Sequence, residues 1–172
     1  MGQIKQQSKQ DAYMTNLMIS LLMRFPEIMS IRFDMPQDKA KFTFILQGKP
    51  EKEQYKGFTD LLKESLAAFQ DLTGEVLQVK TTMQRSGKVS LLVLSSSTKS
   101  LSLEGIHLLC GLVCSSFAES VIRDADTSVD LQDDELLRQE EIIEYLLSHN
   151  TGTKKDNLLA FREAGKVFVY DK

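Results

Sequence analysis

Two consecutive stretches of this chain repeat the same order of polar and apolar residues, and this internal similarity constrains the fold more than any single segment. Each stretch predicts two strands followed by a helix, first in residues 28–74 and again in residues 75–123. Corresponding residues of the two copies are 48 positions apart, so that Ile31 matches Val79. The sequence therefore predicts a domain built from a duplicated strand-strand-helix unit.

Alternation of apolar and polar residues predicts the strands of this region, and longer runs with helical spacing predict the helices. Polar turns between the strands of each copy indicate hairpins, so the sheet is expected to be antiparallel. We therefore expect an α+β fold, with a sheet of at least four strands covered by helices on one face. The expected strands are residues 28–35, 41–46, 76–83 and 89–94, and the expected helices are residues 51–72 and 101–123.

The same alternation predicts which strand residues lie under the helices. The second strands of the two copies align best with a shift of one residue, which matches Phe42 with Val89 and Phe44 with Leu91. A one-residue difference in register exchanges the two faces of a strand, so this shift decides which side of residues 89–94 is buried. The residues expected under the helices are Met29, Ile31, Phe33, Phe42, Phe44, Leu46, Leu77, Val79, Val89, Leu91 and Val93.

The opposite face of the sheet is expected to be partly apolar, and such a surface is rarely left bare. A second copy of the chain or a protein partner would cover it, and a C-terminal strand could add to an exposed sheet edge. The predicted interface residues are Ile28, Ile45, Val76, Leu92, Leu94, Val167 and Val169.

Segments outside the repeat complete the predicted domain organisation. Residues 158–170 allow two interpretations, either a hairpin or a short helix that ends at Gly165 and is followed by a strand. We expect a flexible N-terminus at residues 1–10, an α+β core at residues 11–123 that begins with an amphipathic helix, an acidic linker at residues 124–134, and a C-terminal helix and hairpin as an appendage at residues 135–172.

Bulk properties of the sequence exclude several classes of protein. The longest apolar runs are too short to span a bilayer, and the N-terminus lacks the cleavage site of a signal peptide. Two cysteines in 172 residues provide no disulfide framework of the kind that small secreted domains use. The sequence therefore predicts a cytoplasmic protein with no membrane-spanning segment.

Charge and aromatic residues bear on nucleic-acid binding. Residues 1–123 carry fifteen basic and twelve acidic side chains, which is a poor electrostatic footprint for a nucleic-acid-binding domain. RNA-binding sheets also present aromatic side chains on their exposed face, whereas here the phenylalanines are expected under the helices and the open face is expected to have cations without aromatic neighbours. Nucleic acid is therefore not the expected partner, and weak RNA binding through Arg32 and Lys80 is an alternative hypothesis.

Three residues of the second predicted helix have the spacing of metal ligands or of a thiol nucleophile. His107, Cys110 and Cys114 lie on one face of that helix. The first copy has Leu62 and Leu66 at the positions of the two cysteines, and a free cysteine packs as a small hydrophobic residue. We therefore expect the cysteines in the core, with no metal ion, cofactor or catalytic residue at this position.

The acidic linker resembles a calcium-binding loop of the EF-hand type. Asp124, Asp126, Ser128 and Glu135 fall on loop positions that supply calcium ligands. Val129 stands where the sharp turn of such a loop needs glycine, and only one such loop is present. A solvated linker is therefore the preferred interpretation, and a calcium-responsive sensor is an alternative.

No catalytic constellation is visible in the sequence, because neither a phosphate-binding glycine loop nor a nucleophile elbow is present. The order of elements resembles that of small adaptor and secretion-chaperone domains, which commonly dimerise. We therefore expect a non-enzymatic interaction protein, an adaptor or chaperone-like regulator that binds a protein partner or a second copy of itself. The alternatives are a ligand- or calcium-responsive sensor and a weak RNA-binding domain.

Overall fold

A six-stranded antiparallel sheet forms one layer of the protein in a computed structural model that describes residues 14–123, 133–148, 157–163 and 165–171. Its strands are β1 (Ser30–Asp34), β2 (Lys39–Gln47), β3 (Lys80–Ser86), β4 (Val89–Ser96), β5 (Asn157–Glu163) and β6 (Lys166–Asp171). They are hydrogen-bonded in the order β3-β4-β2-β1-β5-β6. This arrangement confirms the predicted α+β class and the antiparallel sheet.

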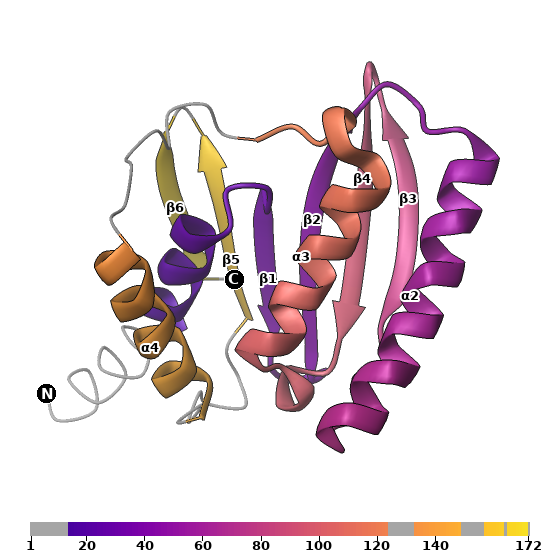
Figure 1. Cartoon of the computed structure of the whole chain (residues 1–172). Helices are drawn as coiled ribbons and strands as arrows, with labels where there is room; N and C mark the ends of the chain where they lie inside the picture. Colours follow the sequence, from indigo (N-terminus) through magenta and orange to yellow (C-terminus); the bar gives the residue numbers. More distant parts are fainter. Residues whose placement is uncertain (1–13, 124–132, 149–156, 164, 172) are drawn as a thin grey trace, which may run out of the picture.

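Helices form the second layer and lie together on one side of the sheet (Figure 1). They are an N-terminal helix at residues 14–24, α2 (Lys52–Thr73), α3 (Leu103–Phe117) and α4 (Asp133–Ser148). The order strand, strand, helix occurs twice, as β1-β2-α2 and as β3-β4-α3. Ser102 begins α3 because its hydroxyl accepts a hydrogen bond from the backbone N–H of Gly105. Gly74 follows α2 with a φ of 75°, a conformation that glycine adopts without strain.

The hydrophobic core fills the space between the sheet and the helices. The N-terminal helix buries its apolar stripe there, as its helical spacing predicts. From the sheet side, Phe33, Phe42 and Phe44 point into the same layer and are buried. Phe58 of α2 packs on Phe117 of α3 with ring centroids 5.2 Å apart, so these two helices also contact one another.

The buried side of β4 differs from the prediction. Leu92 lies opposite Phe44 in the β2–β4 register, and directly opposite residues share a face of the sheet. Leu92 and Leu94 are both 0% exposed, so they belong to the core. The predicted shift of one residue between the second strands is therefore wrong. The residues of β4 on the side away from the helices are Val89, Leu91, Val93 and Ser95.

The C-terminal hairpin belongs to the same sheet as β1 to β4. β5 pairs with β1 in a register that places Ser30 opposite Phe161, and β6 pairs with β5 at the edge. The hairpin interpretation is thereby confirmed, and the alternative helix ending at Gly165 is wrong for the described residues. The segment expected as an appendage therefore supplies two of the six strands.

Arg162 of β5 fastens this hairpin to the N-terminal helix. Its side chain is only 7% exposed, and its Nε donates a hydrogen bond of 3.1 Å to the carbonyl of Ile28. The same guanidinium donates to the carbonyls of Leu22 and Phe25, at the end of the helix and just beyond it. Carbonyls at a helix end have no partner within the helix, so the buried guanidinium supplies a partner to the carbonyl of Leu22. The carbonyl of Phe25 also accepts a hydrogen bond of 3.1 Å from the backbone N–H of Ile28.

Replacement of Arg162 should therefore destabilise the whole domain. We expect Arg162→Met to lower the free energy of unfolding by about 2 kcal/mol or more, because the buried carbonyls of Leu22 and Ile28 lose their side-chain donor. Each buried carbonyl left unpaired costs about 1–3 kcal/mol. Urea unfolding followed by circular dichroism measures this change. Arg138→Met, at an exposed position of α4, is the matched control and should change the stability by less than about 0.5 kcal/mol. Equal effects of the two substitutions would contradict the assignment.

The corrected face of β4 gives a second stability prediction. Leu92→Ala should lower the free energy of unfolding by about 2–5 kcal/mol, since it leaves a cavity in the core. Leu91→Ala, one position away on the half-buried side, should cost less than about 1.5 kcal/mol. The shifted alignment predicts the opposite order of the two effects, so chemical unfolding of the pair distinguishes the two registers.

Candidate functional site

The side of the sheet away from the helices, called the open face below, has no described element over it (Figure 1). Its side chains are half-buried or exposed, whereas their neighbours on the other side are mostly buried. Antiparallel register places residues of all six strands in straight rows across this face. The open face is therefore the largest surface in the described chain where strand side chains are accessible.

One row of the open face crosses all six strands and is rich in cations. It is called the cationic row below and consists, from β3 to β6, of Lys80, Ser95, Lys41, Arg32, Leu159 and Tyr170. Neighbouring strands are about 4.8 Å apart, so Lys41 and Arg32 are direct neighbours and Lys80 is about 10 Å from Lys41. Arg32 is oriented by a hydrogen bond of 3.3 Å from its Nε to Oδ1 of Asn157.

Three aromatic side chains lie on β5 and β6, at the end of the open face away from Lys80, and are called the aromatic trio below. Phe161 of β5 stacks on Phe168 of β6, with ring centroids 5.5 Å apart and an interplanar angle of 24°. It also stacks on Tyr170, again at 5.5 Å and with an angle of 8°. Phe161 pairs with Ser30, two residues from Arg32 on the same side of β1, so it is a diagonal neighbour of Arg32. The prediction that the cations of the open face lack aromatic neighbours is therefore wrong for Arg32.

Phe33, Phe42 and Phe44 are buried under the helices as predicted, so the aromatic trio comes from outside residues 28–123. The alternation of Phe161 with buried Arg162 puts the aromatics on one side of the hairpin. Only the pairing of β5 with β1 places that side on the open face. The alternation in the sequence therefore predicts that the three aromatics share one side of the hairpin. It does not predict which face of the sheet that side joins, because this depends on the pairing of β5 with the distant strand β1.

A groove of about 630 Å³ lies at the β3 end of the cationic row. Lys39, Lys41 and Lys80 line it together with serine hydroxyls of β4 and the following turn. Among the described residues, Asp38 is the only carboxylate in this lining, and hydrogen bonds from Ser97 and Thr98 hold its pKa below its ordinary value. Three lysines against one carboxylate give this groove a positive charge.

The predicted interface residues do not lie on one surface. Val76 is exposed and lines the groove, and Ile45 is half-buried on the open face. Val167 and Val169 face the helix side, opposite Arg162 and Ala160, because the alternation in β6 turns its aromatics to the open face. The residues that are instead buried in the core are Ile28, Leu92 and Leu94, for which the face assignment is wrong.

The cysteines of α3 occupy unreactive positions. Burial raises the pKa of the Cys110 thiol well above its ordinary value, and the nearby carboxylate of Glu27 raises it further. Burial and Glu27 also raise the pKa of Cys114, which is half-buried. Both thiols are therefore protonated at neutral pH, which disfavours a nucleophile. Within the described residues, no group of three side chains could hold a metal ion.

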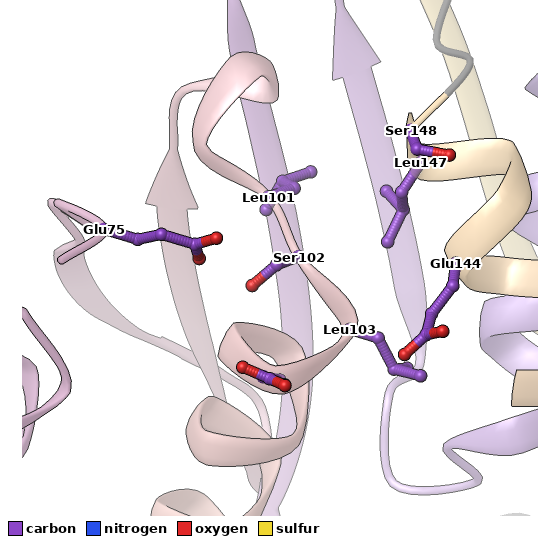
Figure 2. Close-up of a pocket in the computed structure, with 8 residues that line it drawn as sticks. Glu75, Leu101, Ser102, Leu103, Glu144, Leu147 and Ser148 are labelled. Atoms are coloured by element: carbon purple, nitrogen blue, oxygen red, sulfur yellow. The ribbon is translucent and has the colours of Figure 1, made fainter. Parts of the chain in front are cut away.

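Two acidic regions of the chain give no cation site among the described residues. Asp124, Asp126 and Ser128 of the predicted calcium loop lie outside those residues, and Glu135 is exposed near the start of α4. The calcium alternative therefore stays a prediction. A separate pocket of about 250 Å³ has carboxylates in its lining, but Figure 2 shows Glu75 and Glu144 on opposite sides of it. They do not converge on one position.

No protein family, curated protein or solved structure matches the chain. Among the described helices, none combines the length with the hydrophobicity that crossing a bilayer requires. The function is therefore inferred from the chemistry of the open face.

A partly buried ion-pair cluster joins three helical segments away from this face. Glu140 of α4 accepts hydrogen bonds from Arg24 at 2.8 Å and from Nε2 of His107 at 2.9 Å. His107 also packs edge-on against Phe25, with ring centroids 5.0 Å apart. Burial opposes ionisation of Glu140, but the hydrogen bonds from Arg24 and His107 outweigh it and hold its pKa below the ordinary 4.5. The cluster fixes α4 to the N-terminal helix and α3.

This cluster predicts a defined loss of stability in acid. Because the pKa of Glu140 is lower in the folded state, the unfolded state takes up a proton at a higher pH. The contribution of Glu140 is therefore complete above about pH 4.5 and is lost as the pH falls through the folded-state pKa. We expect Glu140→Gln to lower the free energy of unfolding at pH 7 by about 1 kcal/mol, since it weakens charge-assisted hydrogen bonds.

Urea unfolding between about pH 7 and pH 3 measures this effect. The stability difference between the wild-type protein and Glu140→Gln should shrink as the pH falls below about 4.5. Glu141→Gln changes the exposed neighbouring carboxylate and should leave the acid profile of the wild-type protein unchanged. A difference between wild type and Glu140→Gln that is independent of pH would show that the contribution of Glu140 is not electrostatic.

Proposed function

We propose that the chain is a non-enzymatic interaction protein that binds a polyanionic partner through the open face of its sheet. The observation that carries this proposal is the cationic row, in which Arg32, Lys41 and Lys80 are aligned on three strands of one sheet. Cations fixed on strands lose little conformational freedom when a ligand binds, because the backbone already holds their spacing. A polymer with regularly spaced negative charges matches such an arrangement.

The charge balance of the open face supports the same partner class. Net charge over the whole chain is −3, yet the open face of the described strands has more basic than acidic side chains. Such a local excess attracts anionic ligands and raises their rate of association. The basic residues are Arg32, Lys39, Lys41, Lys80 and Lys166, and the acidic ones are Asp34 and Glu163.

Absence of an activated nucleophile among the described residues favours a binding role over a catalytic one. The two thiols have raised pKa values, and the carboxylates of Asp38 and Glu140 are engaged in hydrogen bonds with their neighbours. A binding protein requires only a shaped and charged surface, which the open face supplies. Cytoplasmic location, as the sequence predicts, would bring the chain into contact with abundant polyanions.

A second candidate partner is a protein, either another copy of the chain or the client of an adaptor or chaperone-like regulator. Half-buried apolar residues in the middle of the open face favour it, because burial of such a band is a common source of association. Face-to-face pairing of two copies would, however, bring two basic surfaces together, which disfavours a homodimer of this kind. The apolar band consists of Ile45, Val89, Leu91 and Val93.

Binding to heparin oligosaccharides, a polyanion without bases, tests the proposed function. We expect the wild-type protein to bind in low salt, with an affinity that falls as salt rises. The double variant Lys41→Gln/Lys80→Gln should bind about tenfold more weakly and reduce the slope of the salt dependence by about 1 for each lysine removed. Fluorescence anisotropy of a labelled oligosaccharide measures both quantities.

The matched control removes two lysines from an exposed helix. Lys56→Gln/Lys63→Gln on α2 changes the net charge by the same amount and should leave the affinity almost unchanged. Equal weakening in both double variants would show that binding follows the net charge and not the cationic row. Failure of the wild-type protein to bind, together with a dimer in light scattering, would favour the protein partner instead.

A further inference from the structure

We infer that the polyanion is a single-stranded nucleic acid, whose phosphates lie along the cationic row while its bases stack on the aromatic trio. This inference rests on the proposed function and adds the chemical class of the ligand. Its basis is a juxtaposition within the sheet, because Arg32, Leu159 and Tyr170 are consecutive members of one row. One face thus combines cations with aromatic surfaces for stacking. Binding of heparin or of an acidic peptide requires the cations but not the aromatic surfaces.

The aromatic trio has the exposure that a stacking platform needs. Phe168 is 37% exposed and Tyr170 is 54% exposed, although both stack on the half-buried ring of Phe161. Stacking among the three rings restrains their rotation, so a base that stacks on them meets surfaces that are already ordered. Every base has a flat aromatic face, so such a platform binds single strands with little regard to sequence.

The aromatic trio and the cations lie in two adjacent rows of the open face. The row that follows the cationic row contains Thr82, Val93, Thr43, Ser30, Phe161 and Phe168, so the aromatics occupy the same end in both rows. Six strands extend over about 24 Å at about 4.8 Å for each interval. A short single strand can therefore reach from the platform across Arg32 and Lys41 to the groove at Lys80.

A duplex fits this surface less well than a single strand. Bases of a duplex are stacked on one another and cannot reach rings on the flat surface of a sheet. The cations alone would attract duplex and single strand alike through their phosphates. Preference for single strands therefore measures the contribution of the aromatic trio, separately from that of the charges.

The chain offers a direct reporter of stacking because it contains no tryptophan. Tyr170→Trp places a single indole in the platform, and a mixed-sequence RNA of about ten nucleotides should quench its fluorescence on binding, since stacking on bases is the expected contact. Heparin bound to the same extent should leave the emission almost unchanged. The affinity of wild-type protein for this RNA should exceed that for a duplex of the same length by about tenfold.

Substitutions in the trio give an independent measurement. Phe168→Ala/Tyr170→Ala should weaken RNA binding about tenfold or more and leave heparin binding unchanged, because each base stacked on an aromatic ring contributes strongly to affinity. Tyr170→Phe keeps the ring and should bind RNA like the wild-type protein. Leu72→Ala removes an exposed apolar side chain of α2 and is the matched surface control.

The outcomes separate this inference from the proposed function. Heparin binding through the cationic row, with equal affinity for single strand and duplex and with RNA leaving the emission of the Tyr170→Trp variant unchanged, would overturn the inference and leave the proposed function intact. In that case the trio acts only as a cross-strand cluster that stabilises β5 and β6. Absence of both heparin and RNA binding would overturn both. If the alanine variant unfolds, the quenching measurement and the preference of the wild-type protein for single strands still decide.

Discussion

The guanidinium of Arg162 is the interaction on which the arrangement of the N-terminal helix and the C-terminal hairpin depends. It comes from β5 and donates to the carbonyl of residue 22, in the last turn of the N-terminal helix, and to those of residues 25 and 28, between this helix and β1. Because Arg162 faces the helices, its neighbour Phe161 must face the other side. One buried polar contact therefore fixes both the attachment of the hairpin and the side on which the aromatic trio lies.

The order of strands and helices in residues 28–123 was predictable from the sequence, but one register and the end of the second helix, which is Phe117 and not residue 123, were not. With the uniform offset of 48 positions that fits the rest of this region, Phe44 corresponds to Leu92 and Leu46 to Leu94, and all four residues are buried. The shifted alignment instead matched Phe44 with Leu91, which is apolar but lies on the side of the sheet away from the helices. A strand such as β4, which has apolar residues on both sides, gives no alternation of its own to correct that error.

The candidate site was only partly predictable because it combines segments that are far apart in the sequence. Arg32 and Lys80 could be placed on the open face from local alternation, and the strand register agrees with that placement. The stacking platform could not be placed, because the pairing of Ser30 with Phe161 joins positions more than a hundred residues apart. Local patterns predict the faces of a strand, but not which sheet neighbour it will have.

The place of β1 in the strand order has a consequence for folding during synthesis. β1 is a central strand, yet one of its two neighbours, β5, is made after β2, β3 and β4 and all the described helices. Until residues 157–171 leave the ribosome, β1 is an unpaired sheet edge and the carbonyls that Arg162 later satisfies lack this partner. Pairing over so long a separation is slow, so the nascent chain exposes a strand edge that chaperones or other chains could bind.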